Sequence, residues 1–447
     1  ADERLLDDLA GIVGAANVLT GAADLAPHLV DWRGRYRGRA RCLVKPGATG
    51  EVSAVVRRCA AGRVPMLPQG GNTGLVGGGT PDDSGDTVII GLSRMRRIRE
   101  VDPANFTLTA EAGCLLQQVQ DAAEDADRLF PLSLAAEGSC QLGGNLSTNA
   151  GGVHVLRYGN TRELTLGLEV VLPDGSVWDG LRALRKANTG YDLKQLFIGA
   201  EGTLGVITAA VLKLFPRPRA QAVAWIAVPT PAVAVGLLSA MRSEFGDRVT
   251  AFEIIGSSAL ELVLRHIPGA ARPLAQDRPW QVLVELSDTG NDQDLTATLE
   301  SMLAGAMEAG AIEDAVVAQS GAQARALWKL RESISEAQRI EGFSIKHDIS
   351  VPVSRIAGFL ESAEPRLRDA FGKVRIVAFG HIGDGNLHYN LSRPAGLDND
   401  AFIAQTPLGN RIVHDLVVEL GGSSSAEHGR GQLKREEIRR YKSQTEL

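Results

Sequence analysis

The stretch PQGGNTGLVGGGT, residues Pro68–Thr80, has six glycines in thirteen residues and no charged side chain. Glycine loses more conformational entropy on folding than any other residue, so a loop of this composition needs a compensating role. A Walker loop would contain a lysine after its glycines, and none is present. The loop therefore predicts a nest of backbone N–H groups for a polar or anionic ligand, with Asn72 and Thr73 adding side-chain hydrogen bonds. The alternative is a flexible surface turn.

Two later segments share this composition. PLSLAAEGSCQLGGNLSTNAGG (Pro131–Gly152) is rich in glycine and small polar residues, and YDLKQLFIGAEGTLG (Tyr191–Gly205) contains three more glycines. The first of them is too long for an ordinary turn. Three donor-rich segments with few charges indicate one long, polar, mostly neutral ligand with a diphosphate, and a flavin dinucleotide fits that description. The alternative for each later segment is a set of turns between strands.

The composition of the chain excludes several classes of protein. Its 447 residues predict two or three domains. A net charge of −6 without a basic stripe argues against a nucleic-acid partner. The four cysteines form no CxxC pair, which argues against an iron–sulfur cluster and favours a reduced, cytoplasmic setting. No run approaches the ~20 apolar residues of a membrane span.

Short strands and helices alternate along the whole chain, which predicts an α+β protein. The strands expected before residue 219 are 64–67, 87–92, 107–112, 166–172 and 205–215, with a helix at 51–62. The sequence PRPR at 216–219 is the best candidate for a domain boundary. Beyond it we expect strands at 224–228 and 281–286, strand and turn at 374–391, and helices at 231–244, 294–309, 321–338 and 401–420.

A second constellation lies in FGHIGDGNLHYN, residues 379–390. His381 and His388 flank a glycine turn, so in a hairpin both imidazoles can converge on one metal ion. The later sequence SAEHG supplies Glu427 and His428. Adjacent residues point in opposite directions along a strand, so both can serve one site only if the backbone turns there, which Gly429 and Gly431 permit. The alternative is a set of ordinary hydrogen-bonded histidines.

A cationic group follows in WKLRESISEAQRI, which starts at Trp328 and is expected to be helical. Arg331 and Ser335 lie four residues apart and hence on one helix face. Lys346 follows on an expected strand. An arginine fork, a hydroxyl and a lysine can hold a carboxylate through charge-assisted hydrogen bonds. The alternative is a solvated face of salt bridges.

The three glycine segments resemble the flavin-binding domain of the vanillyl-alcohol oxidase and p-cresol methylhydroxylase superfamily. HIGDGNLH and EHGRG are similar to its D-2-hydroxyacid dehydrogenase branch, and the similarity covers nearly the whole chain. The resemblance implies an FAD-binding domain of two α+β subdomains at 1–219 and an α+β substrate (cap) domain with the metal site at 220–410. It also implies a helical C-terminal segment, 411–447, that returns to the flavin site.

The implied cofactor is FAD. Some members of the superfamily bond the flavin to a histidine in the first loop, and this loop has Asn72 and no histidine, so non-covalent binding is expected. The residues expected to bind FAD are Pro68, Gln69, Gly70, Gly71, Asn72, Thr73, Gly74, Leu75, Glu137, Gly138, Ser139, Gly143, Gly144, Asn145, Ser147, Thr148, Gly152, Val153, Glu201, Gly205, Val206 and Ile207.

The resemblance also implies the reaction. The positions matching His381, His388 and Glu427 would hold a divalent metal, usually taken as zinc, and His428 would be the catalytic base. Positions matching Arg331, Ser335 and Lys346 would bind the distal carboxylate of D-2-hydroxyglutarate, and Asn390 the α-carboxylate or hydroxyl.

Several alternatives stay open. D-lactate, D-malate or glycolate could be the main substrate. A metal-dependent hydrolase with a regulatory nucleotide domain, or a non-catalytic binding module, would belong to a different class. For the dehydrogenase, an external electron acceptor is expected, with an electron-transfer flavoprotein or a quinone fitting the family. The sequence leaves the oligomeric state open, with a homodimer as one candidate.

Overall fold

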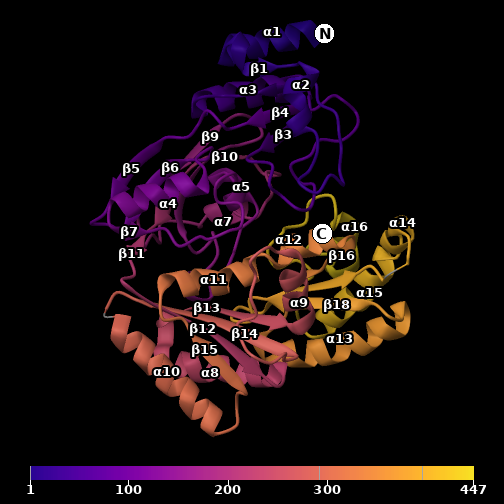
Figure 1. Cartoon of the computed structure of the whole chain (residues 1–447). Helices are drawn as coiled ribbons and strands as arrows, with labels where there is room; N and C mark the ends of the chain where they lie inside the picture. Colours follow the sequence, from indigo (N-terminus) through magenta and orange to yellow (C-terminus); the bar gives the residue numbers. More distant parts are fainter. Residues whose placement is uncertain (1, 291, 395) are drawn as a thin grey trace. The chain divides into compact units, whose positions relative to one another are not determined.

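The computed structural model of the protein describes residues 2–290, 292–394 and 396–447 (Figure 1). The chain divides into two units. The first consists of Ala1–Gly152, Gly159–Arg217 and Glu427–Leu447, and the second of Val153–Tyr158 and Pro218–Ala426. Each unit therefore takes in a short segment that is far from the rest of it in sequence.

A small mixed sheet leads into the first glycine loop. Its strand order is β1 (Val18–Leu19), β2 (Cys42–Val44), β4 (Val88–Gly91) and β3 (Met66–Gln69). β2 and β3 both run parallel to β4, and α3 (Thr49–Ala61) connects them as a crossover helix. The remaining helices of this part are α1 (Asp2–Val13) and α2 (Ala22–Leu25). The glycine loop begins where β3 ends, as the sequence predicts.

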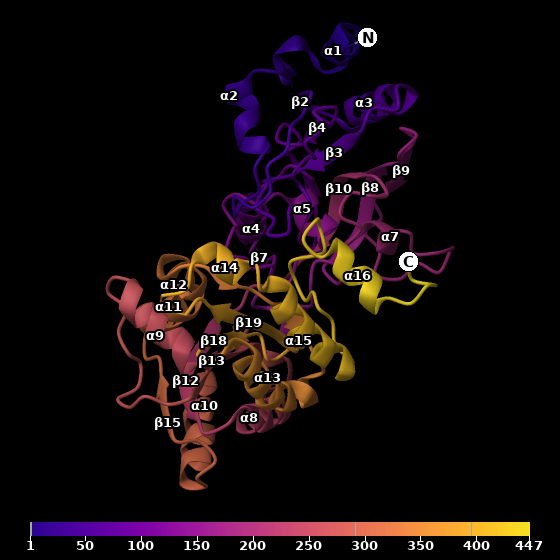
Figure 2. The ribbon, with the colours of Figure 1, turned by 90° about the vertical axis from the view of Figure 1, so that its right-hand side faces the viewer.

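An antiparallel five-stranded sheet forms the other half of the first unit, and Figure 2 labels its strands β8, β9 and β10. Its order is β5 (Ile98–Asp102), β6 (Thr107–Glu111), β10 (Val206–Lys213), β8 (Thr165–Val171) and β9 (Val177–Gly180). The helices are α4 (Leu116–Asp125), α5 (Leu142–Ser147), α7 (Lys194–Phe197) and α16 (Arg435–Tyr441), and β7 (Arg128–Leu129) pairs with β11 (Phe215–Pro216). Two sheets with helices confirm two α+β subdomains.

An eight-stranded sheet organises the second unit. Its order is β15 (Asp314–Val317), β12 (Ala220–Val228), β14 (Trp280–Asp288), β13 (Val249–Gly256), β18 (Arg375–Gly380), β19 (Asn386–Ser392) and β16 (Ser344–Ile345), with β17 (Asp348–Ser350) also paired to β19. Its helices are α6 (Val155–Tyr158), α8 (Pro231–Phe245), α9 (Ser257–His266), α10 (Asp292–Glu308), α11 (Gly321–Glu332), α12 (Ile334–Glu341), α13 (Ile356–Phe371), α14 (Asn399–Ile403) and α15 (Thr406–Glu419).

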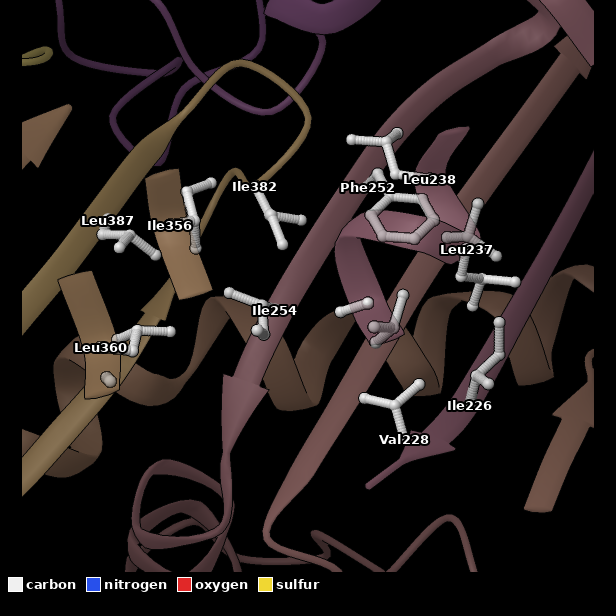
Figure 3. Packing of buried hydrophobic residues seen from close by; sticks show 14 of the residues in the cluster. Ile226, Val228, Leu237, Leu238, Phe252, Ile254, Ile356, Leu360, Ile382 and Leu387 are labelled. Atoms are coloured by element: carbon white, nitrogen blue, oxygen red, sulfur yellow. The ribbon is translucent and has the colours of Figure 1, made fainter. Parts of the chain in front are cut away.

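Helices cover both faces of this sheet, so its strands are apolar on both sides. Along β12, Ala224 and Ile226 pack into one buried cluster with α8, α10 and α13, while Trp225 belongs to a second cluster with α9, α11 and α12. This is the two-residue alternation of a strand. Figure 3 shows the first cluster, where Phe252 of β13 lies beside Leu238 of α8. Full burial of each such side chain stabilises the fold by roughly 1.5–3 kcal/mol.

Two predicted helices differ from the structure. The helix expected at 321–338 is interrupted at Ser333, which separates α11 from α12. The helix expected at 401–420 is likewise split into α14 and α15, with Pro407 in the first turn of α15. Proline disfavours a helix interior and fits the first turn, so Pro407 favours the start of a new helix at this position. None of the helices in the described ranges is both long and apolar enough to cross a membrane.

Candidate active site

The glycine loops of the first unit surround one pocket. Its lining includes Gly70–Gly74 and Gly77–Gly79 of the first loop, Gly143 and Gly144 at the start of α5, and Glu201. A Cβ added to Gly71 would lie 2.1 Å from the Ser139 carbonyl oxygen, so this close backbone approach requires glycine. The first and second loops therefore meet backbone to backbone, which brings their N–H groups to one place.

Some side chains that were predicted to bind the cofactor instead form hydrogen bonds with the protein backbone around the first loop. Gln69 Nε2 donates to the carbonyls of His28 and Gly79, at 2.9 and 2.7 Å. Asn72 Nδ2 donates to the carbonyls of Pro27 and Val30, at 3.0 and 2.9 Å. The two side-chain amides hold the first loop in place. Their N–H groups, which the sequence suggested as donors to the ligand, are used in these internal hydrogen bonds.

The C-terminal segment of the first unit returns to the same pocket. His428 lines it, although the glycine loops lie more than two hundred residues earlier in the chain. The Glu201 carboxylate accepts hydrogen bonds from the amides of Arg430 and Gly431, at 2.7 and 2.8 Å. Gly429 and Gly431 have positive φ angles of 78° and 48°, which confirms the predicted backbone turn after His428.

The pocket suits a polar ligand of low charge. Thr80 Oγ1, Gln141 Oε1 and Asn145 Oδ1 are buried in its lining and have no hydrogen-bond partner among the described residues. Buried polar atoms are nearly always paired in native proteins, so these atoms point to a missing partner. Neutral amide and hydroxyl groups beside a glycine nest match the uncharged ring edge and the diphosphate of a flavin dinucleotide.

Most of the residues expected to bind FAD line this pocket. They are Pro68, Gln69, Gly70, Gly71, Asn72, Thr73, Gly74, Gly143, Gly144, Asn145, Ser147, Thr148, Glu201, Gly205, Val206 and Ile207. The others do not line it, namely Leu75, Glu137, Gly138, Ser139, Gly152 and Val153. Glu137 Oε1 accepts from the Leu134 amide, which shapes the second loop. Val153 belongs to the second unit. Pocket residues that the sequence reasoning missed include Gln141 and Thr80.

In the second unit, the predicted hairpin places His381 and His388 side by side, and their convergence on one metal ion stays a prediction. β18 and β19 pair antiparallel, with Phe379 opposite His388, and His381 follows directly after β18. The two imidazole centroids are 5.7 Å apart. On β19, Leu387, Tyr389 and Leu391 enter the apolar core. The opposite face carries a mostly buried polar row, Asn386, His388, Asn390 and Ser392. A polar row on a covered face indicates a functional site.

Asp348 is a candidate metal ligand that the sequence reasoning missed. It lies opposite His388 on β17, and its Oδ1 is 3.8 Å from His388 Nδ1, so the pair offers ligand atoms close enough for one ion. Asn386 Nδ2 donates to the same carboxylate oxygen, at 2.9 Å. Imidazole and carboxylate are the donors that zinc and similar divalent ions prefer. The residue types around His388 therefore fit a divalent metal.

Glu427 follows Ala426 directly in the chain, and the Ala426 amide donates to the Asp348 carbonyl at 3.3 Å. Ser350 and Ser423 form a bridge next to this contact. Within the first unit, Glu427 Oε1 accepts from the Gly152 amide at 2.8 Å. One carboxylate oxygen of Glu427 is thus held by the end of the second glycine segment.

The four predicted substrate residues have different surroundings. Arg331 is buried, and its Nε donates to Glu253 Oε2 at 2.7 Å. Ser335 is exposed on α12, beyond the break at Ser333, so the structure does not place it on a common buried face with Arg331. Lys346 is half-buried between β16 and β17. Asn390 is buried on β19.

The Asn390 amide connects three segments. Its Oδ1 accepts from the His347 amide at 3.1 Å, and its Nδ2 donates to Gln338 Oε1 at 3.0 Å. It therefore fixes the segment that carries Lys346 relative to β19 and α12.

Two family matches cover most of the chain. Residues 40–180 match the family described as FAD binding domain, and residues 217–447 match the FAD linked oxidases, C-terminal domain. The solved structure of p-cresol methylhydroxylase with substrate bound has the same fold, with a TM-score of 0.74 over 99% of this chain and 92% of that chain, at 15% identity. The chain is an FAD-dependent oxidoreductase, and it belongs to the FAD-linked oxidases of the vanillyl-alcohol oxidase and p-cresol methylhydroxylase superfamily.

Comparison with curated relatives assigns the chain to a narrower family within the FAD-linked oxidases. The mitochondrial D-2-hydroxyglutarate dehydrogenase of Arabidopsis thaliana is 38% identical, covering 96% of this chain and 74% of that protein. The D-2-hydroxyglutarate dehydrogenase of Xanthomonas citri pv. viticola is 37% identical, covering 100% and 92%. The chain belongs to the D-2-hydroxyglutarate dehydrogenase family, so the resemblance in the sequence motifs is confirmed.

Proposed function

We propose that this protein oxidises D-2-hydroxyglutarate to 2-oxoglutarate, with the flavin as electron acceptor. The observation that carries the proposal is the presence of His428 in the lining of the glycine-loop pocket. An imidazole in the lining of this pocket provides a proton acceptor at the proposed cofactor site. Two relatives that match nearly the full length of this chain are both named D-2-hydroxyglutarate dehydrogenase, which supports the choice of substrate.

His428 is the proposed general base. Its imidazole accepts the proton of the substrate's 2-hydroxyl while the C2–H bond breaks and the carbonyl forms. FAD bound in the glycine-loop pocket would supply the acceptor for the hydride that leaves C2. The hydrogen bonds from Arg430 and Gly431 to Glu201 hold the segment that carries His428, so the imidazole is positioned before substrate arrives.

His381, His388 and Glu427 are the proposed ligands of a divalent metal, with zinc as the proposed ion, and Asp348 is a further candidate. A divalent ion at these residues would lower the pKa of the substrate hydroxyl. The donor types, and the contact of Asp348 with His388, support this assignment.

Arg331, Ser335 and Lys346 are proposed to bind the distal carboxylate, and Asn390 the α-carboxylate or hydroxyl. A cationic pocket favours the diacid over D-lactate, because D-lactate has no distal carboxylate to accept the charge-assisted hydrogen bonds that Arg331 and Lys346 can donate. The burial of Arg331 supports this role.

The test is an anaerobic substrate panel with the FAD-loaded protein. D-2-Hydroxyglutarate should bleach the flavin absorbance, and its kcat/KM should exceed that of D-lactate, D-malate and glycolate by about 10² or more. L-2-Hydroxyglutarate is the matched control and should not bleach it. Removal of metal by a chelator should slow the reaction, and added zinc should restore it. Equal rates with D-lactate would contradict the substrate, and activity in a colourless protein would favour a hydrolase.

Four further expectations belong to the same proposal. The flavin is bound without a covalent bond, so denaturation should release it. An electron-transfer flavoprotein or a quinone reoxidises it. The four buried, unpaired thiols fit a reduced, cytoplasmic setting. A homodimer stays a prediction that the mass in solution will test.

A further inference from the structure

Glu253 is a buried carboxylate that none of the roles above uses. It lies in the middle of β13, where its side chain is completely inaccessible. Its neighbours on the same face of the strand, Ala251 and Ile255, belong to an apolar cluster. Burial of an ionised carboxylate is costly unless the charge is paired and hydrogen-bonded. The pairing partners of Glu253 therefore indicate why it is there.

Each carboxylate oxygen of Glu253 has one partner. Oε1 lies 2.5 Å from His381 Nδ1, and Oε2 accepts from Arg331 Nε at 2.7 Å. The guanidinium of Arg331 keeps its positive charge in proteins, so the buried carboxylate paired with it is ionised. Glu253 is thus an anion with one cationic partner, Arg331, and one ring-nitrogen partner, His381.

The contact fixes the imidazole of His381. An ionised carboxylate can only accept, so His381 Nδ1 carries the proton and donates it to Oε1. The other ring nitrogen, Nε2, then keeps the lone pair that a metal ligand needs. Rings of Phe379 and His388 pack around the site, with centroids 4.9 Å apart. Rotation of His381 away from this orientation would leave a buried charge with one partner fewer.

The second contact fixes the guanidinium of Arg331. The group lies over the Phe379 ring, with Cζ 4.8 Å from the ring centroid, and Nε is the nitrogen that binds Glu253. The terminal amino groups of the fork thereby remain available to a substrate carboxylate, which they can bind in the bidentate manner typical of arginine.

We infer that Glu253 is a positioning residue that orients a metal ligand and a substrate-binding arginine together. The inference rests on the proposed function, since it assigns His381 to the metal and Arg331 to the substrate. Preorganised ligands lose less conformational entropy on binding, so both metal affinity and substrate affinity depend on this one carboxylate.

The test compares Glu253→Gln with Glu285→Gln. Glu285 is a matched control, because it is a buried glutamate on the adjacent strand β14 and binds Trp328 Nε1 at 2.7 Å. The glutamine amide at 253 keeps the shape, but it has one acceptor oxygen for two N–H partners. The measurements are the Kd of the metal-free, FAD-loaded protein for Zn²⁺ and the KM for D-2-hydroxyglutarate and D-lactate.

Glu253→Gln should weaken Zn²⁺ binding by about 10- to 100-fold. It should also raise the KM for D-2-hydroxyglutarate about tenfold more than the KM for D-lactate. The reason is that Arg331 loses its charge-assisted hydrogen bond to residue 253 and is no longer oriented toward the distal carboxylate, which D-lactate lacks. Glu285→Gln should change neither quantity. If Glu253→Gln only lowers the melting temperature, and Zn²⁺ affinity and the KM ratio match those of the control, the carboxylate is structural and the inference is wrong.

Nuclear magnetic resonance of ¹⁵N-histidine-labelled protein gives a second test that does not require the variant to fold. His381 should carry its proton on Nδ1 in the unaltered, zinc-loaded protein, and a proton on Nε2 would overturn the inference. A protein that binds no Zn²⁺ and is insensitive to chelators would contradict the proposed metal instead. In that case the KM ratio of Glu253→Gln alone decides the role at Arg331.

Discussion

His428 lies in a segment without regular secondary structure, so no helix or strand determines where its imidazole points. Hydrogen bonds hold the segment instead. Gln432 Nε2 donates to the carbonyls of Gly77 and Thr80, at 2.9 and 3.0 Å, next to the contacts of Glu201. A side chain can therefore be replaced at 428 with little effect on the backbone that carries it.

Replacement of His428 by asparagine should lower kcat for D-2-hydroxyglutarate by about 10²–10⁴-fold, because the general base is lost. The flavin content and the melting temperature should stay close to those of the unaltered protein. Stopped-flow bleaching of the flavin measures the effect. The control is His266→Gln, since His266 pairs with Glu341 in the second unit. A full rate in His428→Asn would assign the base to another residue.

At the scale of elements, the glycine loops act through backbone proximity. Gly71 is packed against the Ser139 carbonyl, whereas Gly74, in the same loop, has no atom within 4 Å of an added Cβ. The two positions look alike in the sequence. Only the contact between the two loops distinguishes them.

Gly71→Ala should therefore destabilise the FAD-free protein by about 1–3 kcal/mol, because the added methyl group forces the first and second loops apart. Gly74→Ala should change the stability of the FAD-free protein by less than about 0.5 kcal/mol. Chemical denaturation of both variants without FAD measures the difference. Equal stability of the two variants would show that the loops can separate at no cost.

The positions of many strands along the chain could be predicted from the sequence. Which strands pair with one another in the sheets could not be predicted. The strands predicted at 64–67, 87–92, 107–112, 166–172 and 205–215 are observed as β3, β4, β6, β8 and β10, within about two residues of their predicted bounds. β13 was missed, although it carries Glu253. Its sequence VTAFEIIG is mostly apolar on both sides of one glutamate, which is typical of a strand covered on both faces and gives no regular alternation.

At the scale of the whole molecule, Glu111 on β6 is an internal anchor of the first unit. Its side chain is 1% exposed, and Arg97 and Arg99 bind its carboxylate at 2.9 and 3.3 Å. Burial alone would raise the pKa of Glu111, but the hydrogen bonds and charges of the two arginines lower it. Because the pKa is lower in the folded state, ionised Glu111 stabilises the fold above the usual glutamate pKa, and this stabilisation is lost as pH falls.

Glu111→Gln should lower the stability of the protein at pH 7 by about 1–3 kcal/mol, the range for hydrogen bonds to charged groups. The difference from the unaltered protein should shrink as the pH falls below about 4, where the carboxyl group protonates in the unfolded chain. Melting temperatures across this pH range measure the effect. Glu100→Gln on the exposed edge strand β5 is the control. A difference that is independent of pH would exclude the charge as its cause.

The sequence by itself determined the cofactor class and the family, because a flavin's diphosphate needs glycine-rich backbone at short spacing. The histidines around a glycine turn predicted a divalent metal, and the resemblance at Glu427 and His428 implied a third ligand and a base; both roles stay predictions. Tertiary structure decided which distant residues meet. Glu253 joins His381 and Arg331 across 128 and 78 residues, and Asp348 joins His388 through the pairing of β17 with β19. Local sequence encodes conformation and burial, whereas strand order and register place residues that are far apart in the chain beside one another.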